Sequence, residues 1–110
     1  MGRFKSKLAV WNPATPARVE ERELLVDTGA SYGWFLRQRL ETLGIRSTGK
    51  MQFRTIDSRI LEREVAPVFV RTEGRVGGDT IVMAESGDAE VWGAHTLESL
   101  GLAADPVRKS

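Results

Sequence analysis

Asp27 occupies the position in this sequence that best suits chemistry. It follows the apolar run Leu24-Leu25-Val26 and precedes the small residues Thr28-Gly29-Ala30-Ser31. A carboxylate at the end of a buried strand is unfavourable unless hydrogen bonds stabilise it, and the threonine brings a hydroxyl. The glycine lets backbone amides approach the carboxylate, while the alanine and serine leave room for a substrate. We therefore expect a loop that holds an acid in a pocket rich in hydrogen-bond donors.

Other chemistries find less support in the sequence. The absence of cysteine excludes disulfides and thiolate metal sites. His95 is the only histidine, and no serine has the strand-to-helix setting of a nucleophile elbow, so His95 is expected at a helix start or on the surface. Four further aspartates lie in turn-like or terminal contexts without a following Thr-Gly or Ser-Gly: Asp57, Asp79, Asp88 and Asp105. Taken alone, Asp-Thr-Gly is also typical of an ordinary turn at a strand end.

The apolar pattern and the turn signals predict an all-β chain with one or two short helices. Strands are expected at residues 8–11, 19–27, 52–56, 60–72, 80–84, 90–92 and 102–105, and helices at 35–43 and 96–100. Turns are expected at residues 57–59, at Gly74, and at residues 77–79 and 86–88. Pro67 lacks an N–H donor, so it places the strand 60–72 at an edge or at a bulge.

A short stretch of the sequence recurs. Leu40-Glu41-Thr42-Leu43-Gly44-Ile45 returns as Leu97-Glu98-Ser99-Leu100-Gly101-Leu102, each time after an apolar strand and a glycine turn. Helices that end in Leu-Gly are common, so the recurrence is compatible with coincidence. The matching context favours a shared strand–turn–helix unit in the two halves of the chain.

In its longer context the sequence resembles the retropepsin-like aspartic proteases of the single-domain type. Residues 24–31 are similar to the active-site signature of that family, and Val91-Trp92-Gly93 is similar to its second element, two apolar residues and a glycine before the C-terminal helix. Residues 96–106 resemble the tail of small microbial members. Two features depart from the family pattern. Trp92 stands where a smaller aliphatic residue is usual, and the flap tip at 55–59 has no glycine.

The resemblance implies a retropepsin-like closed β-barrel that works as a homodimer. It also implies a single domain over residues 1–110, with its core at 8–106. Aspartic proteolysis needs two carboxyl groups, and this chain has one Asp-Thr-Gly, so Asp27 from each of two copies would form the catalytic dyad. The dyad activates a water that hydrolyses a peptide bond, and neither a metal nor another cofactor is required. The substrate would be a peptide or an unfolded protein, bound in an extended form along strand edges.

The resemblance also assigns roles around the dyad. Thr28 would reach across to the matching loop of the partner, and Gly29 would present its N–H to the carboxyl group. Ala30 and Ser31 complete this active-site loop, with a supporting hydrogen bond expected from Ser31.

Residues 55–59 lie where the resemblance places a flap that closes over the substrate. Its substrate-facing residues would be Thr55, Ile56, Asp57 and Ser58, with Ile56 expected to touch a peptide. Trp34, close after the active-site loop, is a candidate to line a substrate pocket. An ordinary exposed hairpin fits the flap residues equally well.

Composition sets limits on the partners. Lys and Arg total 16 against 15 Asp and Glu, a net charge of +1 with both signs interspersed, so neither nucleic acid nor a membrane is expected as a partner. The N-terminal apolar stretch is too short for a signal peptide, and the lack of cysteine fits the cytoplasm. A cytoplasmic aspartic endopeptidase is therefore expected. The alternatives are a catalytically inactive dimer of the same fold that binds peptides or partner proteins, and a structural domain processed from a larger protein.

Overall fold

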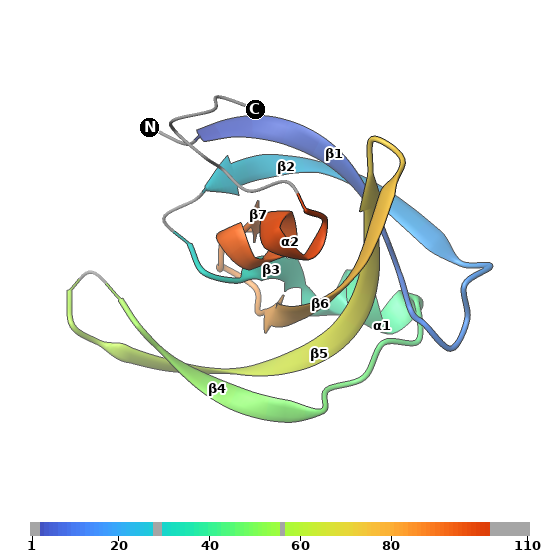
Figure 1. The fold of residues 1–110 in the computed structure, drawn as a ribbon. Coiled ribbons are helices and arrows are strands. Elements are labelled where there is room, and N and C mark those ends of the chain that lie inside the picture. Colours follow the sequence, from blue (N-terminus) through green and yellow to red (C-terminus); the bar gives the residue numbers. More distant parts are fainter. Residues whose placement is uncertain (1–2, 28–29, 56, 102–110) are drawn as a thin grey trace.

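The computed structural model describes residues 3–27, 30–55 and 57–101 (Figure 1). These residues form mostly strands with two short helices, which confirms the all-β prediction. In chain order the elements are β1 (Arg3–Trp11), β2 (Val19–Asp27), β3 (Gly33–Leu36), α1 (Arg37–Thr42), β4 (Gly49–Arg54), β5 (Ile60–Thr72), β6 (Arg75–Ala84), β7 (Val91–Trp92) and α2 (Ala94–Ser99). The strand predicted at 102–105 lies outside the described residues. Within the described part of the chain, neither helix has the length and apolar character that crossing a membrane requires.

The strands form one curled sheet in the order β1-β2-β7-β3-β6-β5-β4 (Figure 1). The curl brings β1 back to β5, where Ala9, Val10 and Trp11 pair with residues 69–71. The expectation of a closed barrel is nevertheless wrong. Among the described strands, β4 pairs with β5 alone, so the sheet keeps an edge, whereas a closed barrel has none.

Pro67 explains how β5 serves two neighbours on one side. Residues 60–65 of β5 pair with β4, and residues 69–71 pair with β1. Pro67 lies between these two segments, while its other side faces Thr80 of β6. A proline can occupy this place because no strand there requires its missing N–H. Pro67 therefore lies at a local edge of the sheet, as predicted, because neither β4 nor β1 pairs with it.

Two element boundaries differ from the prediction. The helix expected at 35–43 begins only at Arg37, because residues 33–36 form β3. Phe35 points into the core while Trp34 and Leu36 on either side are half-buried, which is the alternation of a strand. The turn expected at 77–79 lies inside β6.

The hairpin between β5 and β6 turns at the predicted Gly74. Its turn is formed by Glu73 and Gly74, both at positive φ, between the paired residues Thr72 and Arg75. Gly77 is needed for packing instead. A Cβ atom on Gly77 would lie 2.1 Å from the Ser99 carbonyl oxygen of α2, so the helix rests directly on the backbone of β6.

The hydrophobic core lies on the face of the sheet that the helices cover. Strand register places Val26 beside Trp92, and Phe35 beside Met83, and all four side chains are buried. Leu40 of α1, Leu97 of α2 and Leu100, the residue that caps the C-terminus of α2, belong to the same cluster. Figure 1 shows α2 inside the curl of the sheet.

The recurring sequence forms the same structure at both helix ends. Gly44 and Gly101 take positive φ angles of 78° and 72°. The backbone amide of Gly44 donates to the carbonyl oxygen of Glu41 at 2.9 Å, and the backbone amide of Gly101 donates to the carbonyl oxygen of Glu98 at 3.0 Å. The prediction of a strand, a glycine turn and a helix holds for β7, Gly93 and α2. It is wrong for α1, because β3 leads into that helix directly.

An ion pair fixes the turn after β6 to β5. The Asp88 carboxylate accepts hydrogen bonds from Arg63 Nε at 2.7 Å and Nη2 at 3.0 Å, and from the Glu85 amide at 2.8 Å. The Arg63 guanidinium lowers the pKa of Asp88 from its ordinary value of 3.8, although burial acts in the opposite direction.

We expect Asp88→Asn to lower the free energy of unfolding by about 1–3 kcal/mol at neutral pH, because Arg63 loses a partly buried ionic partner. The folded-state pKa lies below the unfolded value, so the stabilisation is present above the unfolded pKa and is lost as the pH falls through the folded pKa. Urea denaturation of both proteins at neutral pH and near pH ~3 measures the difference. A gap in stability that does not narrow in acid would contradict this assignment.

Candidate active site

Asp27 ends β2 beside the Val91-Trp92-Gly93 segment. Strands β2 and β7 run parallel, with Leu25 opposite Val91 and Val26 opposite Trp92. Asp27 and Gly93 therefore follow one residue further along their strands. The structure brings together the two sequence elements that the resemblance identified, although more than 60 residues separate them.

The loop after Asp27 is held by the first turn of α2. The amides of Ala94 and His95 donate to the carbonyl oxygens of Ala30 and Ser31, each at 2.8 Å. The amide of Ala30 turns back to the Asp27 carbonyl at 3.0 Å. The predicted site residues Thr28 and Gly29 lie outside the described residues.

Gly93 is required by this packing. A Cβ atom on Gly93 would lie 2.4 Å from the backbone carbon of Tyr32 and 2.9 Å from the Gly33 nitrogen. Real Cβ atoms do not approach backbone so closely, so any side chain would push the loop away from α2. The close packing of the loop against residue 93 therefore explains why this position is a glycine.

A row of apolar side chains lies on the same face of the sheet as Asp27. Register pairs Leu25 with Val91, and Val91 with Trp34, and residues paired in this way share a face. Asp27 lies on this face too, because it is two residues from Leu25. All four side chains are half-buried. Asp27 thus ends β2 next to an apolar surface rather than in the main core.

Aromatic residues extend this surface towards β4. Phe53 of β4 contacts Trp34 with ring centroids 5.2 Å apart, and Tyr32 at 6.2 Å. Tyr32 also lies against the His95 ring at 5.3 Å. The sequence singled out Trp34 but not Tyr32 or Phe53, since a contact between the loop and a distant strand leaves no local signal.

The β4–β5 hairpin projects from the body of the sheet with its tip at the predicted flap (Figure 1). Thr55 organises this tip. Its amide donates to the Arg59 carbonyl at 2.8 Å, and its hydroxyl oxygen accepts from the Arg59 amide at 3.0 Å and contacts the Asp57 carboxylate. Ser58 takes a positive φ of 68°, the conformation that glycine favours. Side-chain hydrogen bonds thus shape a tip without glycine; Ile56 lies outside the described residues.

We expect Thr55→Val to raise the pKa of Asp57 towards its ordinary value of 3.8. The Thr55 hydroxyl is the largest of the contacts that lower this pKa, and Arg59 contributes a weaker hydrogen bond. An NMR titration of the Asp57 carboxyl carbon measures the change. Arg59→Gln is the matched control and should give a smaller rise in the pKa; the reverse order would show that the tip is held differently.

Trp92 lies in the core, at the position where the resemblance predicts a smaller aliphatic residue. Its side chain is fully buried and meets the Phe35 ring edge-on, with centroids 4.2 Å apart. The indole Nε1 donates to the Ser6 carbonyl oxygen of β1 at 3.1 Å. The indole therefore packs on β3 in the core and links β7 to β1.

Asp79 has a role that the sequence did not reveal. It was expected in a turn, but it lies within β6 with a buried side chain close to His95 and Thr96 of α2. The expectation for His95 is confirmed, since it lies in the first turn of α2 with its side chain 45% exposed. No local pattern marks Asp79 as buried, because its partners come from a helix 16 residues later.

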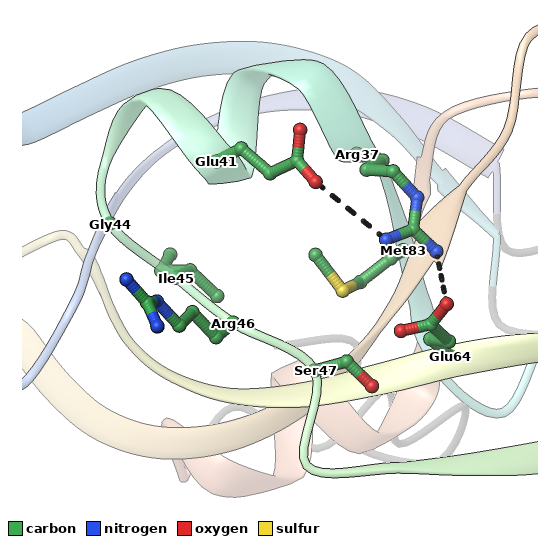
Figure 2. A pocket seen from close by; sticks show the side chains of 8 residues that line it. All are labelled: Arg37, Glu41, Gly44, Ile45, Arg46, Ser47, Glu64 and Met83. Atoms are coloured by element: carbon green, nitrogen blue, oxygen red, sulfur yellow. Dashed lines mark ion pairs between the residues drawn. The ribbon is translucent and has the colours of Figure 1, made fainter.

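A separate hollow of about 480 Å³ lies beside α1 (Figure 2). Its lining includes Arg37 and Met83 but none of the predicted site residues. Arg37 forms ion pairs with Glu85 at 2.9 Å, Glu64 at 3.0 Å and Glu41 at 3.8 Å. Because three carboxylates surround this guanidinium, the hollow is not a ready anion site. In the part of the chain that the structure describes, no group of three or more His, Cys, Asp or Glu side chains is placed so that it could hold a metal ion.

No protein-family model and no curated protein matches the chain. The assignment of a function therefore depends on the residues and geometry described above.

Proposed function

We propose that this chain is an aspartic endopeptidase whose catalytic pair consists of Asp27 from each of two copies. One observation carries the proposal. The end of β2 and the loop after it lie against a second segment, formed by β7, Gly93 and the first turn of α2, and these two segments are far apart in sequence. This arrangement holds a carboxylate at a strand end beside a half-buried apolar surface. Such a surface suits the side chains of a bound peptide.

The second carboxyl group of the dyad comes from a second copy. The other aspartates of the described residues are engaged elsewhere: Asp57 with Thr55 and Arg59, Asp79 with Thr96 and His95, and Asp88 with Arg63. A two-fold axis close to the Asp27 loop brings the same loop of the partner to the site. The half-buried apolar row beside Asp27 is then covered in the dimer or by substrate.

The chemistry needs only these two carboxyl groups and a water. Two carboxyl groups within hydrogen-bonding distance share one proton, because like charges so close cannot both ionise. The ionised group takes a proton from the water, whose oxygen attacks the peptide carbonyl carbon, while the protonated group gives its proton to the carbonyl oxygen. The group that took the water's proton then gives it to the nitrogen while the other carboxylate takes a proton from a hydroxyl of the tetrahedral diol, and the C–N bond breaks. The products are a carboxyl group and an amine, and one proton again remains on the dyad.

The hairpin formed by β4 and β5 supplies the flap. Its tip, which includes Thr55 and residues 57–59, projects from the sheet (Figure 1) and is followed by Ile60, which is 57% exposed. An extended peptide between the flap and the apolar row would be shielded from bulk water.

The test is cleavage of an unfolded protein by the purified chain over pH ~3 to 7, the range in which carboxyl dyads titrate. Product fragments are identified by mass spectrometry, and the oligomeric state is measured by sedimentation. We expect cleavage that follows dimer formation. A chain that is monomeric at all concentrations and never cleaves would refute the proposal.

A non-cleaving dimer that binds peptides is the second candidate. The firmly hydrogen-bonded tip at Thr55 favours it, because a tip held by its own side chains opens and closes less readily. Peptide binding by the parent chain without any cleavage would support this candidate.

A further inference from the structure

We propose that Asp79 is a positioning residue for the Asp27 loop and acts through His95 and Thr96. The inference rests on the proposed function for its effect on catalysis. Its effect on the loop is independent of that function.

Asp79 is a buried carboxylate with two specific partners. Its side chain is 0% exposed. The Thr96 hydroxyl donates to Oδ2 at 2.5 Å, and His95 Nδ1 lies 2.5 Å from Oδ1. The second contact thus joins a ring nitrogen of His95 to the other oxygen of the same side chain. Both oxygens of the carboxylate therefore hold consecutive residues of α2.

The turn of α2 that contains these two residues also connects to the active-site loop. The backbone amide of His95 donates to Ser31, and the neighbouring Ala94 amide donates to Ala30, each at 2.8 Å. The His95 ring also lies against Tyr32. The side chains that Asp79 fixes thus belong to the turn that grips the loop after Asp27.

The strand that follows the loop lies close to the same hydroxyl. A Cβ atom on Gly33 would lie 3.2 Å from Thr96 Oγ1, so this strand passes close above the Asp79–Thr96 hydrogen bond. If the turn of α2 shifts, the carbonyl oxygens of the loop lose their donors. A small displacement of a catalytic group is enough to slow a reaction strongly.

Thr96→Val and Asp79→Asn test the proposal. Valine keeps the shape of threonine but removes the hydroxyl that donates to Asp79. Asparagine in place of Asp79 keeps one oxygen but replaces the other with an NH₂ group, which cannot accept a hydrogen bond. In each variant we expect the hydrogen-exchange protection of the Ala94 and His95 amides to fall by about tenfold or more. We expect kcat to fall by a similar factor while KM changes by less than about twofold, because the reacting groups rather than the substrate contacts are misplaced.

Two further variants separate positioning from general stability. Thr96→Ser retains the hydroxyl and should restore both the amide protection and kcat. Val10→Ala removes a buried contact in β1, away from the loop, and should destabilise the fold while leaving kcat unchanged where the protein is folded.

The outcomes distinguish this inference from the proposed function. If the parent never cleaves, the proposed function fails, and the amide protection alone decides whether Asp79 positions the loop. If Thr96→Val and Asp79→Asn keep both the protection and kcat of the parent, the inference is overturned. It is also overturned if Val10→Ala lowers kcat as much as they do.

Discussion

Asp27→Asn should abolish peptide hydrolysis while leaving the fold intact. Asparagine has nearly the same shape, but it can neither take a proton from water nor share one with a second carboxyl group. Removing a general acid–base group lowers the rate by about 10²–10⁴-fold or more. Fragment release from an unfolded protein measures the rate, and circular dichroism checks the fold. Asp88→Asn is a matched exchange outside the loop and should still cleave at pH values where it is folded.

Mixing the parent chain with Asp27→Asn tests whether the dyad is shared between copies. If chains exchange freely, a ninefold excess of the variant leaves about one-tenth of the parent activity, because few dimers then contain two intact copies. An active site complete within one chain would lose nothing on mixing. Undiminished activity in the mixture would therefore rule out a dyad made from two copies.

Trp92→Ala should have the largest effect on stability. Trp92 is fully buried, contacts Phe35 and donates to the Ser6 carbonyl oxygen. Truncating a buried tryptophan costs about 3–5 kcal/mol through lost burial and the cavity left behind. A domain of this size has a total stability of only about 5–15 kcal/mol, so the variant should unfold at a much lower urea concentration or fail to fold. Denaturation followed by circular dichroism measures the loss.

Trp92→Phe separates packing from hydrogen bonding. Phenylalanine keeps much of the apolar volume but leaves the Ser6 carbonyl oxygen without its indole donor, so we expect a loss of about 1–3 kcal/mol. A loss as large as that of Trp92→Ala would mean that the hydrogen bond, rather than the packed volume, stabilises this part of the core.

The sequence predicted the elements whose signals are local. The strand 19–27 has the predicted bounds because the apolar triplet and the break at Asp27 are adjacent in the chain. The hairpin around residue 57 and the helix ends at Gly44 and Gly101 were predicted for the same reason. These features depend on neighbouring residues, so single-sequence patterns are enough to find them.

The features that the sequence missed depend on distant contacts. Gly77 and Gly78 suggested a turn, but Gly77 is needed because α2 packs on it, more than 20 residues away in sequence. Asp79 appeared to belong to the same turn for that reason. The position of β4 at the sheet edge likewise depends on how β5 divides its length between two partners, which no local pattern encodes.

The exposed margin of β4 has a consequence for self-association. Unpaired strand backbone invites edge-to-edge stacking between molecules, and charged side chains on such a strand discourage it. The exposed residues of β4 include Lys50 and Arg54, which alternate with the half-buried Met51 and Phe53. These two cations would repel β4 of another copy, which opposes edge-to-edge pairing between molecules. The backbone of the strand stays accessible to a flexible chain that does not carry the same positive charge.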